Sequence, residues 1–150
     1  MTEIEVRPLR AEDRERWVEL WSGYLSFYRA NLSDEVTESS FARLCAGDAG
    51  MVGLVAVGPD DVPIGLAHLV FHPATWSTVS SCYLEDLFVD RRQRGGDVAR
   101  ALFDAVYARA RAAGADRVYW HTQQFNGPAR SLYDTVGRLT SFVVYEHDLD

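Results

Sequence analysis

A glycine-rich turn, two adjacent carboxylates and a phenol are the groups in this sequence whose types and spacing could do chemistry. The turn spans Arg94–Ala99 and follows an apolar stretch that ends at Asp90. Glycines let the backbone approach a ligand closely, and N–H groups at the start of a helix bind anions such as phosphate. Local arginines in a chain of net charge -7 also favour an anion: Arg91, Arg92, Arg94 and Arg100. The sequence therefore predicts a phosphate-binding turn.

The two carboxylates, Glu85 and Asp86, lie inside the apolar stretch Ser81–Asp90. Strict alternation along a strand predicts two faces, with Tyr83, Glu85, Leu87 and Val89 on one and Cys82, Leu84, Asp86 and Phe88 on the other. An ionisable side chain in an apolar strand is unfavourable unless it is paired or used. We interpret Glu85 as functional and Asp86 as structural; an internal ion pair with an arginine is the alternative for either.

The phenol is Tyr133, two turns into an expected helix that begins at Asn126. Asparagine is favoured as the N-cap of a helix, and Pro128 suits its first turn. A phenol near a thioester sulfur can return a proton to the leaving thiolate. The alternative for Tyr133 is ordinary packing in the core.

At these residues the chain resembles the GNAT superfamily of acyl-CoA-dependent N-acyltransferases. The acyl-CoA motif of the family (Arg or Gln, two residues, Gly, one residue, Gly or Ala) matches Arg94–Ala99, except that Asp97 stands where the family nearly always has glycine. A later family motif matches Asn126, Ala129, Leu132, Tyr133 and Gly137. The string LEDLFV at residues 84–89 is similar to the polyamine, diamine and Hpa-type amine acetyltransferase branch.

The resemblance implies acetyl-CoA as co-substrate, a small amine as acceptor and no metal. The implied cofactor contacts are Leu87, Phe88, Val89, Arg94, Gly95, Gly96, Asp97, Val98, Ala99, Asn126 and Ala129. In the family, the stretch that matches Leu87–Val89 runs beside the pantetheine arm. The spacing of the later motif favours Tyr133 as general acid, and the position of Glu85 implies a base or a group that holds the amine. The acidic composition is compatible with a cationic acceptor.

Asp97 leaves three orientations open. Facing the pyrophosphate, it would weaken binding, because two like charges at ~4 Å cost about 1 kcal/mol or more. It could instead cap the helix through first-turn N–H groups, or pair with Arg94 or Arg100. Asp97 favours an alternative function, a non-catalytic GNAT-fold protein that binds acyl-CoA or regulates. The joint presence of Tyr133 and Glu85 favours the enzyme.

Residues 11–30 are expected to form a helix with one broad aromatic face. The residues of this face are Trp17, Leu20, Trp21, Tyr24, Leu25 and Tyr28. Most belong to the core, but the hydroxyls of Tyr24 and Tyr28 need polar partners, which suits the edge of a pocket. The first helices wall the acceptor pocket in the resembling family, so we assign Tyr24, Tyr28 and Glu85 to substrate binding.

The remaining pattern predicts further strands at residues 4–9, 51–57, 63–72, 117–123 and 140–148, and helices at 33–46, from the turn to Gly114, and at 126–136. This order is also the GNAT topology. We therefore expect a single N-acetyltransferase domain over residues 1–150, with an α/β GNAT fold of four helices around a mixed twisted sheet of about six to seven strands.

Composition narrows the function classes. A pI near 5.0 argues against nucleic-acid binding, which requires many cationic contacts. The apolar runs are too short to cross a bilayer and the N-terminus has mixed charge, so we expect a cytoplasmic protein without membrane partners. We also expect a homodimer.

Covalent and metal chemistry find little support in the sequence. Cys45 and Cys82 have no CxxC spacing, and His68, His72, His121 and His147 show no ligand spacing, so we expect reduced thiols and no metal site. The chain has neither a GxSxG motif nor a cysteine in a reactive context.

Overall fold

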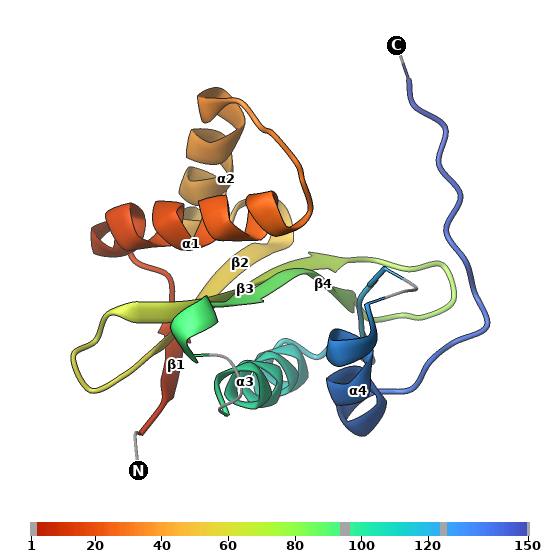
Figure 1. The fold of residues 1–150 in the computed structure, drawn as a ribbon. Helices are drawn as coiled ribbons and strands as arrows, with labels where there is room; N and C mark the ends of the chain where they lie inside the picture. Colours follow the sequence, from red (N-terminus) through yellow and green to blue (C-terminus); the bar gives the residue numbers. More distant parts are fainter. Residues whose placement is uncertain (1–2, 94–96, 124–125, 150) are drawn as a thin grey trace. The chain divides into compact units, whose positions relative to one another are not determined.

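The computed structural model describes residues 3–93, 97–123 and 126–149. The chain forms two compact units, Met1–Trp120 and His121–Asp150. Among the described residues, the first unit contains the β-sheet and helices α1 to α3, and the second contains α4 (Figure 1).

The sheet follows the order of the chain, β1-β2-β3-β4-β5. Its strands are β1 (Glu5–Pro8), β2 (Met51–Val57), β3 (Pro63–His72), β4 (Ser81–Val89) and β5 (Val118–Tyr119). The first four strands pair antiparallel, and β5 runs parallel to β4. The mixed sheet is therefore confirmed, but the predicted strand 117–123 is reduced to two residues.

The helices are α1 (Arg14–Phe27), α2 (Asp34–Ala46), α3 (Val98–Ala112) and α4 (Gly127–Val136). Ser33 is the N-cap of α2, because its hydroxyl accepts the Val36 N–H at 3.3 Å. Gly114 follows α3 at φ 79°, a conformation that favours glycine, and its N–H donates to the Arg111 carbonyl at 3.0 Å. Local sequence signals thus set these helix ends.

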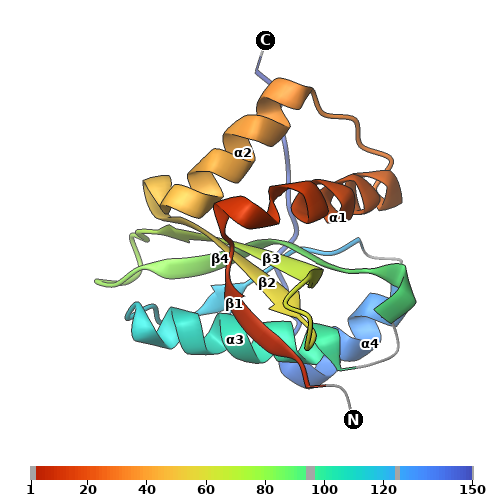
Figure 2. The same cartoon turned by 90° about the vertical axis from the view of Figure 1, so that its left-hand side faces the viewer.

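Within the first unit, α1 and α2 cover one face of the sheet and α3 covers the other (Figure 2). Trp17 is fully buried on the first face and stacks on Trp21 at 5.5 Å. On the α3 face, Leu102 is likewise inaccessible. A Cβ on Gly65 would lie 3.2 Å from Leu102 Cδ1, so this glycine lets α3 approach β3 closely. The aromatic face predicted for the first helix is confirmed as core.

Strand β4 contains a β-bulge. The β3–β4 register pairs Leu69 with Leu84 and His68 with Asp86, so Glu85 is an inserted residue between the two pairs. A bulge opposes two residues to one on the neighbouring strand and bends the strand locally. Residues before and after Glu85 therefore follow different alternations.

The predicted faces of β4 are wrong for this reason. Phe88 belongs to the core under α1, and Asp86, two residues away, lies on the same face. Leu84 instead pairs with Leu69 and lies on the α3 face, although it was expected beside Asp86. An apolar strand with two carboxylates looks the same in sequence with or without a bulge.

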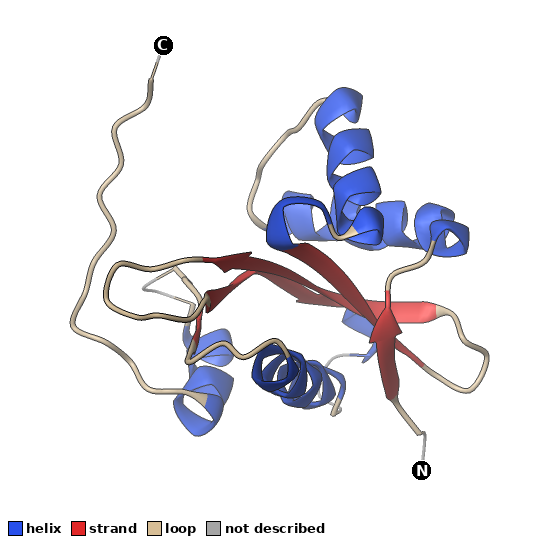
Figure 3. Cartoon of the chain, turned by 180° about the vertical axis from the view of Figure 1, so that it is seen from behind, coloured by secondary structure: helices blue, strands red, loops and turns tan. Residues whose placement is uncertain are grey.

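The predicted strand at residues 140–148 is also wrong. Residues 138–149, all described, contain no strand and are drawn as loop in Figure 3. Large apolar side chains are exposed there, including Phe142 at 79% and Tyr145 at 93%. An alternating pattern identifies residues that suit a strand, but a strand also needs a neighbour that supplies its hydrogen bonds. The described sheet has five strands, fewer than predicted.

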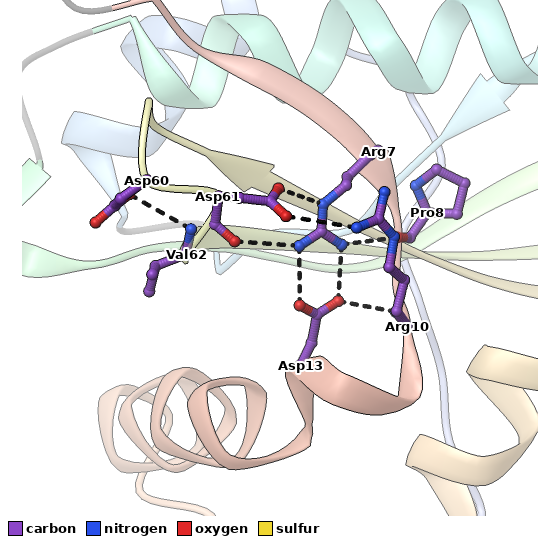
Figure 4. Close-up of polar contacts among 7 residues, drawn as sticks. All are labelled: Arg7, Pro8, Arg10, Asp13, Asp60, Asp61 and Val62. Atoms are coloured by element: carbon purple, nitrogen blue, oxygen red, sulfur yellow. Dashed lines mark hydrogen bonds and ion pairs between the residues drawn. The ribbon is translucent and has the colours of Figure 1, made fainter.

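A buried ion-pair network joins β1, the start of α1 and the β2–β3 turn (Figure 4). Arg7 binds both oxygens of Asp13, at 2.8 and 2.9 Å, and its Nε donates to Asp61 at 2.8 Å. Burial would raise the pKa of Asp13, but hydrogen bonds from Arg7 and from the Arg10 N–H hold that pKa below its usual value. The sequence analysis did not single out this network, because its members are far apart in the chain.

Candidate active site

Strand β4 carries the two carboxylates that the sequence singled out. Glu85, at the bulge, has an exposed side chain, and Asp86 has a side chain only 13% exposed on the α1 face. Adjacent carboxylates therefore have different surroundings, which the bulge produces. Among the described residues no arginine pairs with Asp86, so the predicted alternative of such an ion pair is not found there.

The partner of Asp86 is a histidine. His68 Nδ1 lies 2.8 Å from Asp86 Oδ2, and the Trp17 indole N–H donates to His68 Nε2 at 3.0 Å. Trp17 is fully buried and His68 is 3% exposed. The sequence analysis gave His68 no role. One signal was available, since a histidine in the apolar strand Pro63–His72 requires polar partners.

Tyr24 and Tyr28, at the end of α1, face the same carboxylate. Burial is the main cause that raises the pKa of Tyr24, followed by the charge of Asp86 and a hydrogen bond to it. Burial and then Asp86 also raise the pKa of Tyr28. The rings of the two tyrosines lie 5.0 Å apart, and Tyr24 packs edge-on against Phe88 at 6.1 Å. The structure thus brings both predicted acceptor-binding tyrosines to Asp86.

A second aromatic group lies beside Glu85. Burial, followed by the Glu85 charge, raises the pKa of Tyr83 to about 12. Tyr83 stacks on Tyr119 at 4.8 Å, and His72 Nε2 lies 2.6 Å from the Tyr119 hydroxyl. The Arg117 guanidinium carbon lies 4.3 Å from the Tyr119 ring centre. Sequence reasoning predicted both strands but missed this group, because a sequence does not show which side chains of two neighbouring strands lie together.

The predicted phosphate-binding turn is described only in part, since Arg94, Gly95 and Gly96 lie outside the described residues. Asp97 is exposed, and its carbonyl accepts the Ala101 N–H at 2.9 Å. Within the described part of the chain, its carboxylate accepts no capping hydrogen bond, so the capping alternative is wrong. Val98 is 3% exposed and Ala99 is half-buried.

Asp90 organises the approach to this turn. Its carboxylate accepts the Arg92 N–H at 3.0 Å and forms ion pairs with Arg16 and, at 3.5 Å, with the Arg92 side chain. Burial would raise the pKa of Asp90, but the Arg92 N–H and the Arg16 guanidinium hold that pKa below its usual value. Arg92, one of the arginines near the turn, therefore forms an ion pair within the protein, which a count of arginines did not reveal.

The second unit carries the remaining predicted residues on α4. Tyr133, Ala129 and Leu132 are half-buried, and the Tyr133 carbonyl accepts the Gly137 N–H at 2.8 Å. Asn126 occupies the N-cap position, but its side chain makes no capping hydrogen bond among the described residues. The expected side-chain cap is therefore wrong, and one physical reason is that Pro128, in the first turn, has no N–H to donate.

The described residues offer neither a metal-binding cluster nor a membrane-spanning helix. No group of three or more His, Cys, Asp or Glu side chains there could hold a metal ion. Nor does this part of the chain contain a helix with the length and apolar character needed to cross a bilayer.

The mixed sheet, with α1 and α2 on one face and α3 on the other, defines an α/β fold. The aminoglycoside acetyltransferase AAC(6')-Iy, solved with the bisubstrate analog CoA-S-monomethyl-acetylneamine, superposes with a TM-score of 0.84 at 18% identity, covering 99% of both chains. A ribosomal-protein-alanine N-acetyltransferase from Brucella melitensis biovar Abortus 2308 gives 0.80 at 17% identity, covering 98% of this chain and 100% of the other. At such identities the likeness establishes the fold.

Sequence similarity establishes the family. The Acetyltransferase (GNAT) family profile matches residues 11–137. The D-amino-acid N-acetyltransferase HPA3 of Saccharomyces cerevisiae is 33% identical over 146 residues, which is 97% of this chain and 91% of the yeast protein. The chain belongs to the GNAT family of acetyltransferases and is an N-acetyltransferase, so the predicted family and enzyme class are confirmed.

Proposed function

We propose that the enzyme transfers an acetyl group from acetyl-CoA to the primary amine of a small cationic acceptor. The observation that carries this proposal is the anionic surface formed by Glu85 and Asp86 beside Tyr24 and Tyr28. An ammonium group is the cation that complements two adjacent carboxylates and phenol oxygens. The yeast relative is named for D-amino acids, so these are the first acceptors to test.

We propose that the pantetheine arm lies along Leu87–Val89 and the pyrophosphate at Arg94–Ala99. In support, the β4–β5 ladder pairs only Cys82 and Tyr83 of β4. A ladder that ends early leaves room along a strand edge for the amides of an extended ligand. Asp97 is exposed and makes no capping hydrogen bond within the described residues, which is compatible with binding at this turn.

In the proposed mechanism, both substrates are held in one complex, which removes much of the entropic cost of a bimolecular step. Glu85, exposed at the bulge, accepts the proton of the acceptor amine, directly or through water. The backbone N–H near Val89 stabilises negative charge on the acyl oxygen. Tyr133 donates its proton to the departing thiolate, and Asn126 and Ala129 help to hold the cofactor.

We also propose that the chain is one catalytic domain and forms a homodimer in the cytoplasm. Cys45 and Cys82 are both thiols, which suits a reducing compartment. Exposed apolar side chains between Leu139 and Tyr145 provide surface for a contact between copies. Sedimentation and cell fractionation would test the two statements separately.

The test of the function is acetyl-CoA titration by calorimetry, followed by an amine panel with thiol detection. We expect acetyl-CoA to bind, and thiol release to depend on a primary amine. Absence of binding at millimolar CoA, together with no thiol release from any amine, would contradict the proposal.

A further inference from the structure

Three side chains from three elements form a buried hydrogen-bonded chain in the first unit. Trp17 comes from α1, His68 from β3 and Asp86 from β4. The Trp17 indole N–H donates to His68 Nε2 at 3.0 Å, and His68 Nδ1 lies 2.8 Å from Asp86 Oδ2. The first two side chains are almost fully buried, and the third reaches the partly exposed surface where Tyr24 lies.

The donor capacities in this chain determine the tautomer of His68. An indole nitrogen can only donate, so His68 Nε2 must accept, and the ring hydrogen is on Nδ1. Nδ1–H then donates to Asp86 Oδ2. An imidazolium would direct a second N–H at the Trp17 N–H, which the 3.0 Å contact does not accommodate. His68 therefore fits this site as a neutral donor that orients Asp86 without cancelling its charge.

The groups that surround His68 and Asp86 supply no other cation. From α1, Tyr24 and Tyr28 face Asp86, and β4 adds Glu85 at the bulge. Strand β2 places only Gly53 opposite His68. The arginine ion pairs described in the structure go to other carboxylates, namely Asp13, Glu19, Glu38, Asp61 and Asp90. Within the described residues, Asp86 thus keeps a negative charge that no arginine neutralises.

We propose that Asp86 binds the ammonium group of the acceptor, and that His68 and Trp17 are positioning residues that orient its carboxylate. The inference rests on the proposed function, because it assumes a cationic acceptor. The two adjacent carboxylates then have separate roles, since Asp86 binds the ammonium group and Glu85 removes its proton. The tyrosines at the end of α1 border the same site and contact the body of the acceptor.

The first experiment measures amine binding without catalysis. Benzylamine, a cation at neutral pH, and aniline, a neutral aromatic amine, are titrated by calorimetry into the full chain. We expect wild type to bind benzylamine and His68→Leu to weaken this binding at least about ten-fold, as expected for loss of a hydrogen bond to a charged group. His68→Asn, which retains an N–H donor, should recover most of the affinity, and aniline binding should not respond to either change.

The matched control uses the neighbouring indole. Trp21 stacks on Trp17, but its Nε1 is buried without a hydrogen-bond partner among the described residues. Trp17→Phe and Trp21→Phe each replace an indole by a smaller ring, and Trp17→Phe alone removes a donor to His68. We expect Trp17→Phe to weaken benzylamine binding and to raise the acceptor KM more than it lowers kcat. Trp21→Phe should change neither benzylamine binding nor the acceptor KM. Thermal unfolding verifies that both variants fold.

Several outcomes would overturn the inference. Equal benzylamine affinity in wild type and His68→Leu would remove His68 from acceptor binding. Equal effects of Trp17→Phe and Trp21→Phe on benzylamine binding would mean that packing, and not the Trp17 hydrogen bond, explains the change. Absence of benzylamine binding in a wild-type enzyme that acetylates other amines would overturn the inference and leave the proposed function intact. Benzylamine binding without any acetyl-CoA binding would contradict the proposed function and leave this inference intact.

Discussion

Asp86 in β4 and Asp90 just after it are both partly buried carboxylates, but their partners differ in charge. Asp90 is held by Arg16 and Arg92, and the pKa of its carboxyl lies below the usual value because of these contacts and despite burial. Asp86 instead lies 2.8 Å from His68 Nδ1, and the other ring nitrogen of His68 accepts from the Trp17 indole N–H. The comparison teaches that two similarly buried carboxylates can differ in what their partners leave available: two arginines offset the charge of Asp90, whereas no arginine in the described residues pairs with Asp86, the carboxylate that we propose to bind the acceptor.

The largest expected effect is on kcat and concerns Glu85, the proposed base, in contrast to Asp86, which we propose to bind the acceptor. Glu85→Gln should lower kcat about a hundred-fold near neutral pH, because general base catalysis contributes roughly 10²–10⁴. The rate should rise again at higher pH, where more of the amine is already deprotonated. An unchanged pH–rate profile would make Glu85 structural.

The next prediction tests the two aspartates directly. Asp86→Asn should raise the acceptor KM about thirty-fold with a smaller change in kcat, since it removes the charge that binds the ammonium. Asp90→Asn should leave that KM nearly unchanged and lower the free energy of unfolding by about 1–2 kcal/mol, because Arg16 loses one of its two carboxylate partners. Steady-state kinetics and urea unfolding of both variants measure the difference, and an equal KM in both would invalidate the distinction.

Tyr133 provides a comparison without a carboxylate. Tyr133→Phe should lower turnover roughly ten-fold or more, because a general acid is lost, with acetyl-CoA affinity nearly unchanged. Pre-steady-state kinetics should verify that the chemical step limits the rate. Equal turnover of wild type and variant under that condition would remove Tyr133 from the mechanism.

Asp97 extends the comparison to the cofactor turn. If its exposed carboxylate faces the pyrophosphate, Asp97→Gly should tighten CoA binding about ten-fold by removing one like-charge contact. Stability should change by only a few tenths of a kcal/mol, because Asp97 makes no capping hydrogen bond within the described residues and glycine is tolerated at the N-cap. Calorimetry gives the affinity, and an unchanged value would mean that the side chain points away.

The smallest effect concerns acid stability. Asp13 and Asp90 have folded-state pKa values below the usual value of 3.8, so both favour the folded state when they are ionised. Their contribution is complete above about pH 4 and is lost as the pH falls through the folded-state pKa values. The free energy of unfolding, measured with urea between pH 6 and pH 2, should therefore decline at the acid end. This decline should be roughly 1 kcal/mol smaller in Asp13→Asn than in wild type. Identical pH dependence in the two proteins would contradict the assignment.

Sequence reasoning succeeded where local chemistry determines the structure. β2 and β3 were predicted to the residue, because turn residues bound each strand, and Ser33 identified the start of α2. The aromatic face of α1 was also correct, since helical spacing fixes which side chains share a face. These features depend on residues close together in the chain.

The failures concern features that depend on a distant partner. The bulge at Glu85 exists only in the register between β3 and β4, and the role of His68 depends on Trp17, which lies on another element. The predicted strand at 140–148 lacked a neighbouring strand in the described chain, and the Asn126 side chain makes no capping hydrogen bond there, where Pro128 offers no N–H. Sequence patterns specify what a residue prefers, but the partner determines what it does.

The inserted residue in β4 also affects how relatives should be aligned. Because Glu85 interrupts the alternation, Leu84 belongs to one core and Asp86 to the opposite surface, although two residues in a regular strand would share a side. If the Glu85–Asp86 pair were kept and one residue ahead of it were lost, Glu85 would take the place opposite Leu69 that Leu84 now occupies, and an anion would replace a buried aliphatic group. Alignment gaps in this strand are therefore more consequential than substitutions. Two homologues with the same pair of acidic letters would differ in acceptor chemistry if only one of them retained the extra residue.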